Sequence, residues 1–65
     1  MSLYDYEASK QISLSDPPFY ALIMAAARKA DTENLDRLTI MWPDTIDEFR
    51  QRYIAPGGLL EGEEL

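Results

Sequence analysis

The sequence predicts an all-α protein, a compact bundle of three to four short helices followed by an acidic C-terminal tail. Apolar residues recur at helical spacing, and proline, glycine and capping residues divide the chain into helix-length segments. No alternating run of β-branched residues is long enough to form a strand. We expect a single helical domain over residues 1–56. The tail at 57–65, which a glycine pair begins, is expected to be flexible or ordered by a partner.

The N-terminal segment is expected to form a helix over about residues 3–13. Its apolar residues Tyr4, Ala8 and Ile12 recur every four positions, which places them on one face of a helix. Serines in and after this segment lower its helix propensity, because their hydroxyl groups compete for backbone hydrogen bonds. The spacing therefore predicts a helix here in spite of the composition.

The central segment, residues 19–30, has a composition that strongly favours a helix. Asp16 is expected to cap it, and Pro17 at the first helical position loses nothing by lacking an N–H group. Leucine, methionine and five alanines follow. Arg28 and Lys29 lie in the last turn, where cations interact favourably with the helix dipole.

Two shorter helices are expected at about residues 33–41 and 45–53. Asp31 or Thr32 caps the first of them. Pro43 ends it, because the residue before a proline avoids the helical region, and the next helix begins at or directly after this proline. A proline followed by two glycines ends the last helix.

The small size of the chain favours a protein that works in contact with another surface. A chain of 65 residues buries only about 60% of the surface that its unfolded form exposes. Such a core supplies about 3–5 kcal/mol. The sequence has no Cys and no His, so disulfides and the usual zinc ligands are lacking. Oligomerisation or partner binding therefore remains as the additional source of stability for the fold.

The central helix is apolar on most of its circumference, which is typical of a buried helix. Its two apolar stripes contain Phe19, Leu22, Ile23 and Ala26 on one side and Tyr20, Met24 and Ala27 on another. Either the other three helices surround it, or one stripe contacts a second chain, and the need for support favours the second chain. Trp42 can anchor a partner, although closure of the core at a helix junction is the preferred interpretation. The residues expected at a partner or oligomer interface are Phe19, Tyr20, Met24, Ala27, Trp42 and Tyr53.

No catalytic residue, metal site or cofactor is expected. Nucleophilic catalysis needs a nucleophile and a base that activates it, and the chain has neither Cys nor His. The acidic clusters at residues 31–36 and 44–48 begin helices, where capping and the helix dipole explain them. Neither cluster has the central glycine of a calcium-binding loop, and there is no glycine-rich phosphate-binding loop. The sequence therefore predicts a non-enzymatic protein.

The charge and hydropathy of the chain exclude two classes of partner. The net charge is −6, from twelve acidic and six basic residues, which disfavours direct binding to duplex DNA. The longest apolar run, residues 21–27, is far shorter than a membrane-spanning helix. The N-terminus is acidic and aromatic, unlike a secretory signal. We expect a cytoplasmic protein without a membrane partner.

Two small basic groups give a second functional hypothesis. Arg28 and Lys29 form one group, and Arg50 and Arg52 form the other. With a tyrosine for stacking, they can contact a small anionic ligand such as a nucleotide or cyclic nucleotide, which the protein would sequester. The preferred alternative is that they balance neighbouring acids, since Glu48 and Arg52 have the favourable spacing of four residues.

Three segments of the chain resemble small uncharacterised proteins of tailed bacteriophages. They are YDYEAS at 4–9, DPPFYALIMAAARKAD at 16–31 and RYIAPGG at 52–58. The resemblance implies a protein that acts in the cytoplasm of an infected bacterium. By analogy of class, it implies binding to a host protein, including components of host defence, and modulating or inhibiting that protein. The leading hypothesis is therefore an interaction protein that acts as a homo-oligomer, and a virion structural or assembly component is a further alternative.

Overall fold

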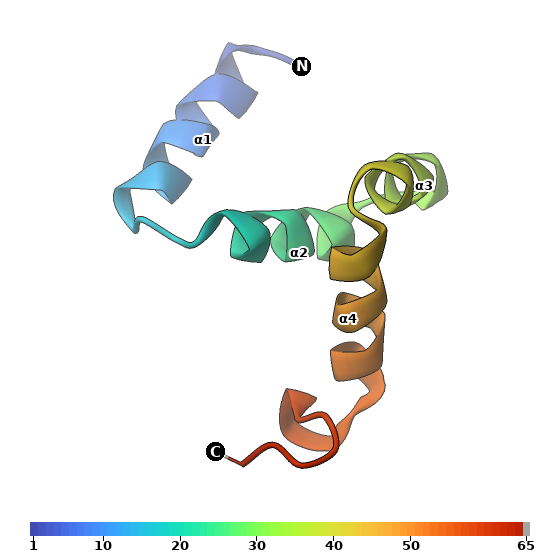
Figure 1. The fold of residues 1–65 in the computed structure, drawn as a ribbon. Helices are drawn as coiled ribbons and strands as arrows, with labels where there is room; N and C mark the ends of the chain where they lie inside the picture. The colour runs from blue at the N-terminus through green and yellow to red at the C-terminus, as the bar shows by residue number, and fades with distance from the viewer. Residues whose placement is uncertain (65) are drawn as a thin grey trace.

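The computed structural model describes residues 1–64, and their fold is all-α (Figure 1). The four helices are α1 (Leu3–Leu14), α2 (Phe19–Lys29), α3 (Thr32–Met41) and α4 (Pro43–Ile54), and a 3-10 turn follows at Pro56–Gly58. These 64 residues contain no strand. The predicted fold class is confirmed, and every helix boundary lies within two residues of the expected position.

Helices α2, α3 and α4 pack together, whereas α1 extends away from them. Each of the three packed helices contacts the other two, and the 3-10 turn lies against α4. Among the described residues, no other element lies against α1, which Figure 1 shows projecting from the start of α2. Only α3 and α4 therefore cover α2, so the three other helices do not surround it.

The core of the described chain is small and centres on Ile46. Only Ile23 and Ala27 of α2 and Ile46 of α4 are buried in residues 1–64, and Ile46 has no exposed surface. Partly buried side chains that pack against these three are Leu35, Leu38, Trp42 and Phe49. The buried line on α2 runs between the two predicted stripes. Both stripes therefore keep exposed members.

The start of α2 differs from the prediction. Asp16 does not cap this helix; the N-cap position is Pro18, which provides no side-chain hydrogen bond. Pro18 is extended, with φ −58° and ψ 148°, and Asp16 lies in the left-handed region with φ 49°. The cause is the second proline: a residue before a proline avoids the helical region, so Pro17 cannot begin the helix. The helix starts only after both prolines.

Trp42 joins α3 to α4 without any intervening loop. Its backbone N–H donates to the carbonyl of Leu38 at 2.8 Å, which closes α3, and its own carbonyl accepts from the N–H of Ile46 at 3.0 Å, which opens α4. Pro43 takes the first position of α4, where its missing N–H costs nothing. One residue therefore ends one helix and begins the next.

The N-cap of α3 is Asp31, one of the two residues that the sequence offers for this role. Its Oδ1 atom accepts a hydrogen bond from the N–H of Asn34 at 2.9 Å. We expect Asp31→Ala to lower the free energy of unfolding by about 1 kcal/mol, because that N–H loses its acceptor. Asp31→Asn is the matched control, since asparagine caps equally well, and urea denaturation followed by circular dichroism measures both. Equal stabilities for the two variants would contradict the capping role.

Candidate functional site

An apolar groove, here called the α2/α3 groove, runs between the second and third helices. Its volume is about 480 Å³. The α2 wall contributes the small side chains Ala26 and Ala30, which leave the space open. The remaining lining residues are Lys29, Asn34, Arg37, Leu38, Met41 and Trp42. The groove thus combines an apolar floor with two cations and an amide.

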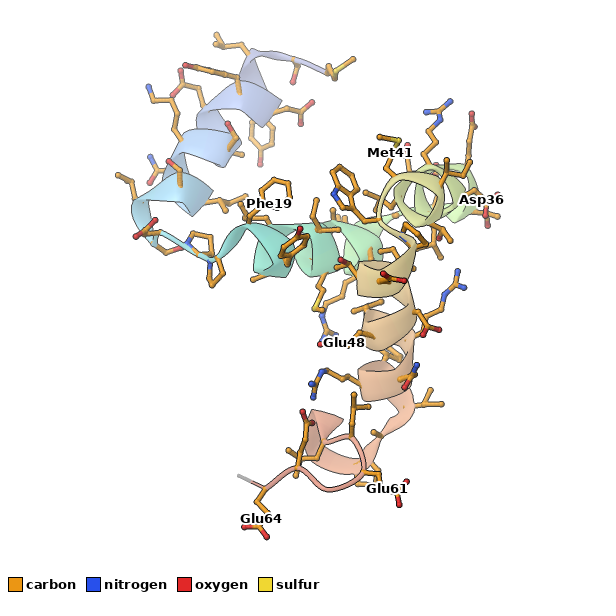
Figure 2. All side chains as sticks on the ribbon, in the orientation of Figure 1. Phe19, Asp36, Met41, Glu48, Glu61 and Glu64 are labelled. Carbon is orange, nitrogen blue, oxygen red and sulfur yellow. The ribbon has the colours of Figure 1, made fainter. Side chains whose placement is uncertain are left out.

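Exposed side chains extend this apolar surface beyond the groove itself. The ring of Phe19 lies edge-on to Trp42, with 6.0 Å between ring centroids, and edge-on to Tyr20 at 5.4 Å. Phe19 is 56% exposed and Met41 is 67% exposed. Figure 2 shows both side chains on the side of the molecule away from α4. The open face therefore reaches from the start of α2 to the end of α3.

Helix α1 carries a second set of uncovered apolar side chains. None of its residues is buried. Its five large apolar side chains, each more than half exposed, are Leu3, Tyr4, Tyr6, Ile12 and Leu14. Sequence reasoning identified the spacing of Tyr4 and Ile12 as a helix signal but placed no interface residue on this helix.

The total exposed area of the chain is large for its mass. The accessible surface is 5663 Å² for 7.4 kDa. A folded monomer of this mass is expected to expose roughly 4,200 Å², so the excess is roughly 1,400 Å². The exposed large apolar side chains include all five of α1 together with Phe19, Tyr20 and Met41.

A smaller groove, here called the α2/α4 groove, brings two arginines and two aromatic rings together. Its volume is about 240 Å³, and Arg28, Phe49, Arg50 and Tyr53 line it with Ala27 and Ile54. The guanidinium of Arg28 lies 5.3 Å from the ring centroid of Phe49 and 5.5 Å from that of Tyr53. Within residues 1–64, neither Arg28 nor Arg50 forms an ion pair. The groove therefore presents two unneutralised cations beside stacking surfaces.

Arg52 does not belong to this groove, which corrects its assignment as an anion contact. Its Nη1 and Nη2 atoms donate to the two carboxylate oxygens of Glu63 at 2.6 and 2.8 Å. Its Nη1 atom also donates to the carbonyl of Gly58 at 2.8 Å, and its Nε atom donates to Glu48 at 3.0 Å. The expected balance between Glu48 and Arg52 is therefore present. Lys29 lies apart from Arg28 and Arg50, in the α2/α3 groove.

The same contacts order the C-terminal tail on α4 of its own chain. Gly57 and Gly58 have φ values of 63° and 71°, a left-handed conformation that turns the chain back toward Arg52. Leu59 and Leu60 are half-buried. Up to residue 64, the tail thus makes contacts with the helix before it; Leu65 lies outside the described residues.

Glu63 gives the tail a pH dependence. The hydrogen bonds from Arg52, and then the one from the Leu60 N–H, lower the pKa of Glu63 from 4.5 to about 2. Because the folded pKa is lowered, the stabilisation is complete above about pH 4.5 and is lost as the pH falls toward 2. We expect Glu63→Gln to release the tail at pH 7, measured as faster amide hydrogen exchange at Leu59 and Leu60. Glu64→Gln is the control, and unchanged exchange in the Glu63 variant would contradict the docking role.

The structure distributes the six predicted interface residues over different environments. Phe19, Tyr20 and Tyr53 are exposed, whereas Met24 and Trp42 are half-buried. Ala27 is 6% exposed because it packs in the core, so it offers almost no surface to a partner. Tyr20 and Met24 line a third hollow, of about 260 Å³, together with Asp44, Thr45 and Glu48. The six residues therefore do not form one surface.

Sequence reasoning did not select Leu38 and Met41 for the interface, although both line the α2/α3 groove. Which neighbouring helix these two side chains face depends on how α2 and α3 cross, and the sequence does not determine that crossing. Acidic residues outside the grooves have local roles, as in the 2.6 Å ion pair between Glu33 and Arg37. In residues 1–64 no three His, Cys, Asp or Glu side chains are grouped so that they can hold a metal ion. None of the helices described here has both the length and the apolar character needed to cross a bilayer.

The role of these surfaces is inferred from their own geometry. No family model, curated protein or solved structure matches this chain. The α2/α3 groove, the α2/α4 groove and the exposed face of α1 are the features from which a function can be argued.

Proposed function

We propose that this chain is a non-enzymatic interaction protein that self-associates and binds a protein partner through its apolar surfaces. The observation that carries the proposal is the excess of exposed area, roughly 1,400 Å² beyond that of a compact monomer of equal mass. The phage resemblance extends the proposal: the partner is then a host protein that the chain modulates or inhibits.

The distribution of the exposed area supports an interface rather than a solvated surface. Monomeric proteins rarely expose contiguous apolar patches of more than a few hundred Å². Here Met41 and Trp42 line the α2/α3 groove, and Phe19 lies edge-on to Trp42 beside it. Aromatic and methionine side chains are the types enriched at the centre of interfaces. Only three side chains are buried in residues 1–64, so the chain gains little stability by itself.

Size-exclusion chromatography with light scattering tests the self-association. We expect one defined oligomer at micromolar concentrations, with dissociation on dilution. A monodisperse monomer that unfolds at the same temperature at every concentration would contradict this part of the proposal, because association with the folded state makes the melting temperature concentration-dependent.

Affinity capture from bacteria tests the host partner with a matched variant. Met41→Lys places a charge on the exposed edge of the α2/α3 groove, whereas Ile40→Lys places the same charge on a neighbouring residue that does not line the groove. We expect one host protein to be retained by the wild type and by the Ile40 variant and to be lost with the Met41 variant, because this partner binds the self-associated form of the chain, which depends on the groove. Equal recovery with all three chains would argue against a groove-dependent partner.

A second candidate function is binding of a small planar anion in the α2/α4 groove. It is favoured by the position of Arg28 over two aromatic rings and by the presence of Arg50 in the same groove. Guanidinium groups bind phosphate in a bidentate manner, and the rings of Phe49 and Tyr53 offer stacking surfaces. A nucleotide or cyclic nucleotide has both of these features.

A thermal-shift panel of nucleotides and cyclic nucleotides tests this candidate. We expect one ligand to raise the melting temperature of the wild type and of Arg37→Gln but not that of Arg50→Gln. The Arg37 variant is the control, because it removes a charge of the same kind from a residue that does not line the α2/α4 groove. If no ligand at millimolar concentration raises the melting temperature, this candidate function is ruled out.

A further inference from the structure

We infer that α1 of one copy occupies the α2/α3 groove of a second copy, and that the two copies exchange α1 reciprocally in a two-fold symmetric dimer. The inference rests on the self-association proposed above and names the surfaces that produce it. It accounts at once for a helix that lacks a packing partner and for an apolar groove that lacks an occupant.

Helix α1 needs contacts that its own chain does not provide. It has 12 residues, and isolated helices shorter than about 12–15 residues are marginal in water. Its support is local: Ser2 accepts a hydrogen bond from the N–H of Asp5 at 3.1 Å, and Ser9 and Ser13 donate to carbonyls one turn earlier. Hydrogen bonds of this last kind disfavour a helix rather than stabilise it. Helix α1 therefore lacks the packing of its apolar side chains that would stabilise it.

The α2/α3 groove has the features of a helix-binding site. Peptide helices commonly bind by laying an apolar face into a hydrophobic groove. Ala26 and Ala30 have small side chains, so a second helix can approach α2 closely on this side of the groove. Leu38, Met41 and Trp42 provide the apolar contact on the other side. A groove of about 480 Å³ accepts several side chains of such a helix.

The linker between α1 and α2 directs α1 away from its own groove. Residues 15–18 end in two prolines, each with a fixed φ, and Pro18 adopts the extended polyproline conformation. Asp16, with φ 49°, adds a third restricted position. Such a linker is stiff, and Figure 1 shows α1 rising from the start of α2 at an angle to it, with no other element packed against it among the described residues. In this arrangement α1 does not contact the groove of its own chain, and a second chain is the proposed source of that contact.

Charge and area both fit a second copy of this chain. Lys29 on the rim of the groove forms no ion pair within residues 1–64. Helix α1 brings Asp5 and Glu7, whose contacts with the N-terminal amine at 3.6 Å and with Lys10 at 3.4 Å are exposed and easily exchanged.

The excess area of roughly 1,400 Å² per chain corresponds to roughly 2,800 Å² in a dimer, within the range of obligate homodimers. A reciprocal exchange covers both features in each chain with a single partner. It also gives the closed two-fold symmetry that is commonest among oligomers. A different partner protein would cover the groove and α1 only by providing two unrelated surfaces.

Complementation between two variants tests the exchange. The arm variant carries Tyr4→Lys and Ile12→Lys on α1, and the groove variant carries Met41→Lys. All three positions are exposed in the single chain, so circular dichroism is expected to show the packed helices intact. Light scattering is expected to give a dimer for the wild type and for the control Ile40→Lys, and a monomer for each variant alone. An equal mixture of the two variants is expected to regain dimer, because the intact α1 of one fits the intact groove of the other.

Each other outcome overturns the inference in a distinguishable way. A wild-type monomer overturns both the exchange and the proposed self-association. An oligomer that survives both sets of substitutions leaves self-association standing and removes α1 and the groove as its cause. The mixed dimer keeps one intact contact of the two, so the mixture is measured at a protein concentration well above the one at which the wild type dimerises. Two variants that stay monomeric on mixing at that concentration show that α1 and the groove each matter but do not contact one another.

A cross-linking experiment measures the same contact by proximity. The sequence has no cysteine, so an introduced cysteine is the only thiol in each chain. A chain with Ile12→Cys, mixed with one carrying Met41→Cys, is expected to give at least ten times more bismaleimide-linked heterodimer than a mixture with Ile40→Cys. Equal yields with the two acceptors would overturn the placement of α1 in the groove.

Discussion

Replacing Ile46 by alanine is expected to lower the free energy of unfolding by about 2–5 kcal/mol, the range for truncating a buried isoleucine. Ile46 has no exposed surface and packs with Ile23 and Ala27 at the centre of the core. A core of this size supplies only about 3–5 kcal/mol in total, so the loss approaches the whole stability of the chain. We therefore expect a large unfolded fraction in the absence of denaturant.

Urea denaturation followed by circular dichroism measures the effect, at one fixed protein concentration because the proposed self-association would add to the apparent stability. Ile40→Ala is the matched control: Ile40 is 76% exposed, so the same truncation is expected to change the stability by no more than about 0.5 kcal/mol. Similar values for the two variants would show that Ile46 does not organise the core.

The helices were predictable because their signals are local. Apolar spacing and one capping aspartate, Asp31, place α3 within a residue of its observed start. The error at α2 is also local in origin, since Asp16 precedes two prolines and only the second can directly precede a helix. After two consecutive prolines, a helix is therefore expected to begin only beyond the second one.

The grooves and the docked tail were less predictable because they depend on contacts between elements. Ala27 is apolar and lies beside Ala26 in sequence, yet one is in the core and the other lines a groove. Which of them is buried is decided by the crossing of α2 with α3 and α4, which periodicity does not determine. The contact between Arg52 and Glu63 likewise spans eleven positions and requires the left-handed turn at Gly57.

Removing the side chain of Trp42 is expected to have the second large effect. The indole packs against the core and lies edge-on to Phe19, at the residue whose backbone joins α3 to α4. We expect Trp42→Ala to lower the free energy of unfolding by about 2–3 kcal/mol, less than for a fully buried tryptophan because Trp42 is half-buried.

Trp42→Phe separates the packing role of Trp42 from the backbone junction. Phenylalanine keeps an aromatic ring against the core and toward Phe19, so we expect a cost of no more than about 1.5 kcal/mol. Both variants retain the backbone hydrogen bonds at residue 42, and a large difference between them therefore measures ring packing alone. If the alanine variant is as stable as the phenylalanine variant, the ring adds little, and the junction is held by its backbone and by Pro43. In that case the indole, which lines the groove, serves mainly the proposed contact with α1 of a second copy. Its removal would then change the dissociation constant of the proposed dimer rather than the stability of the chain.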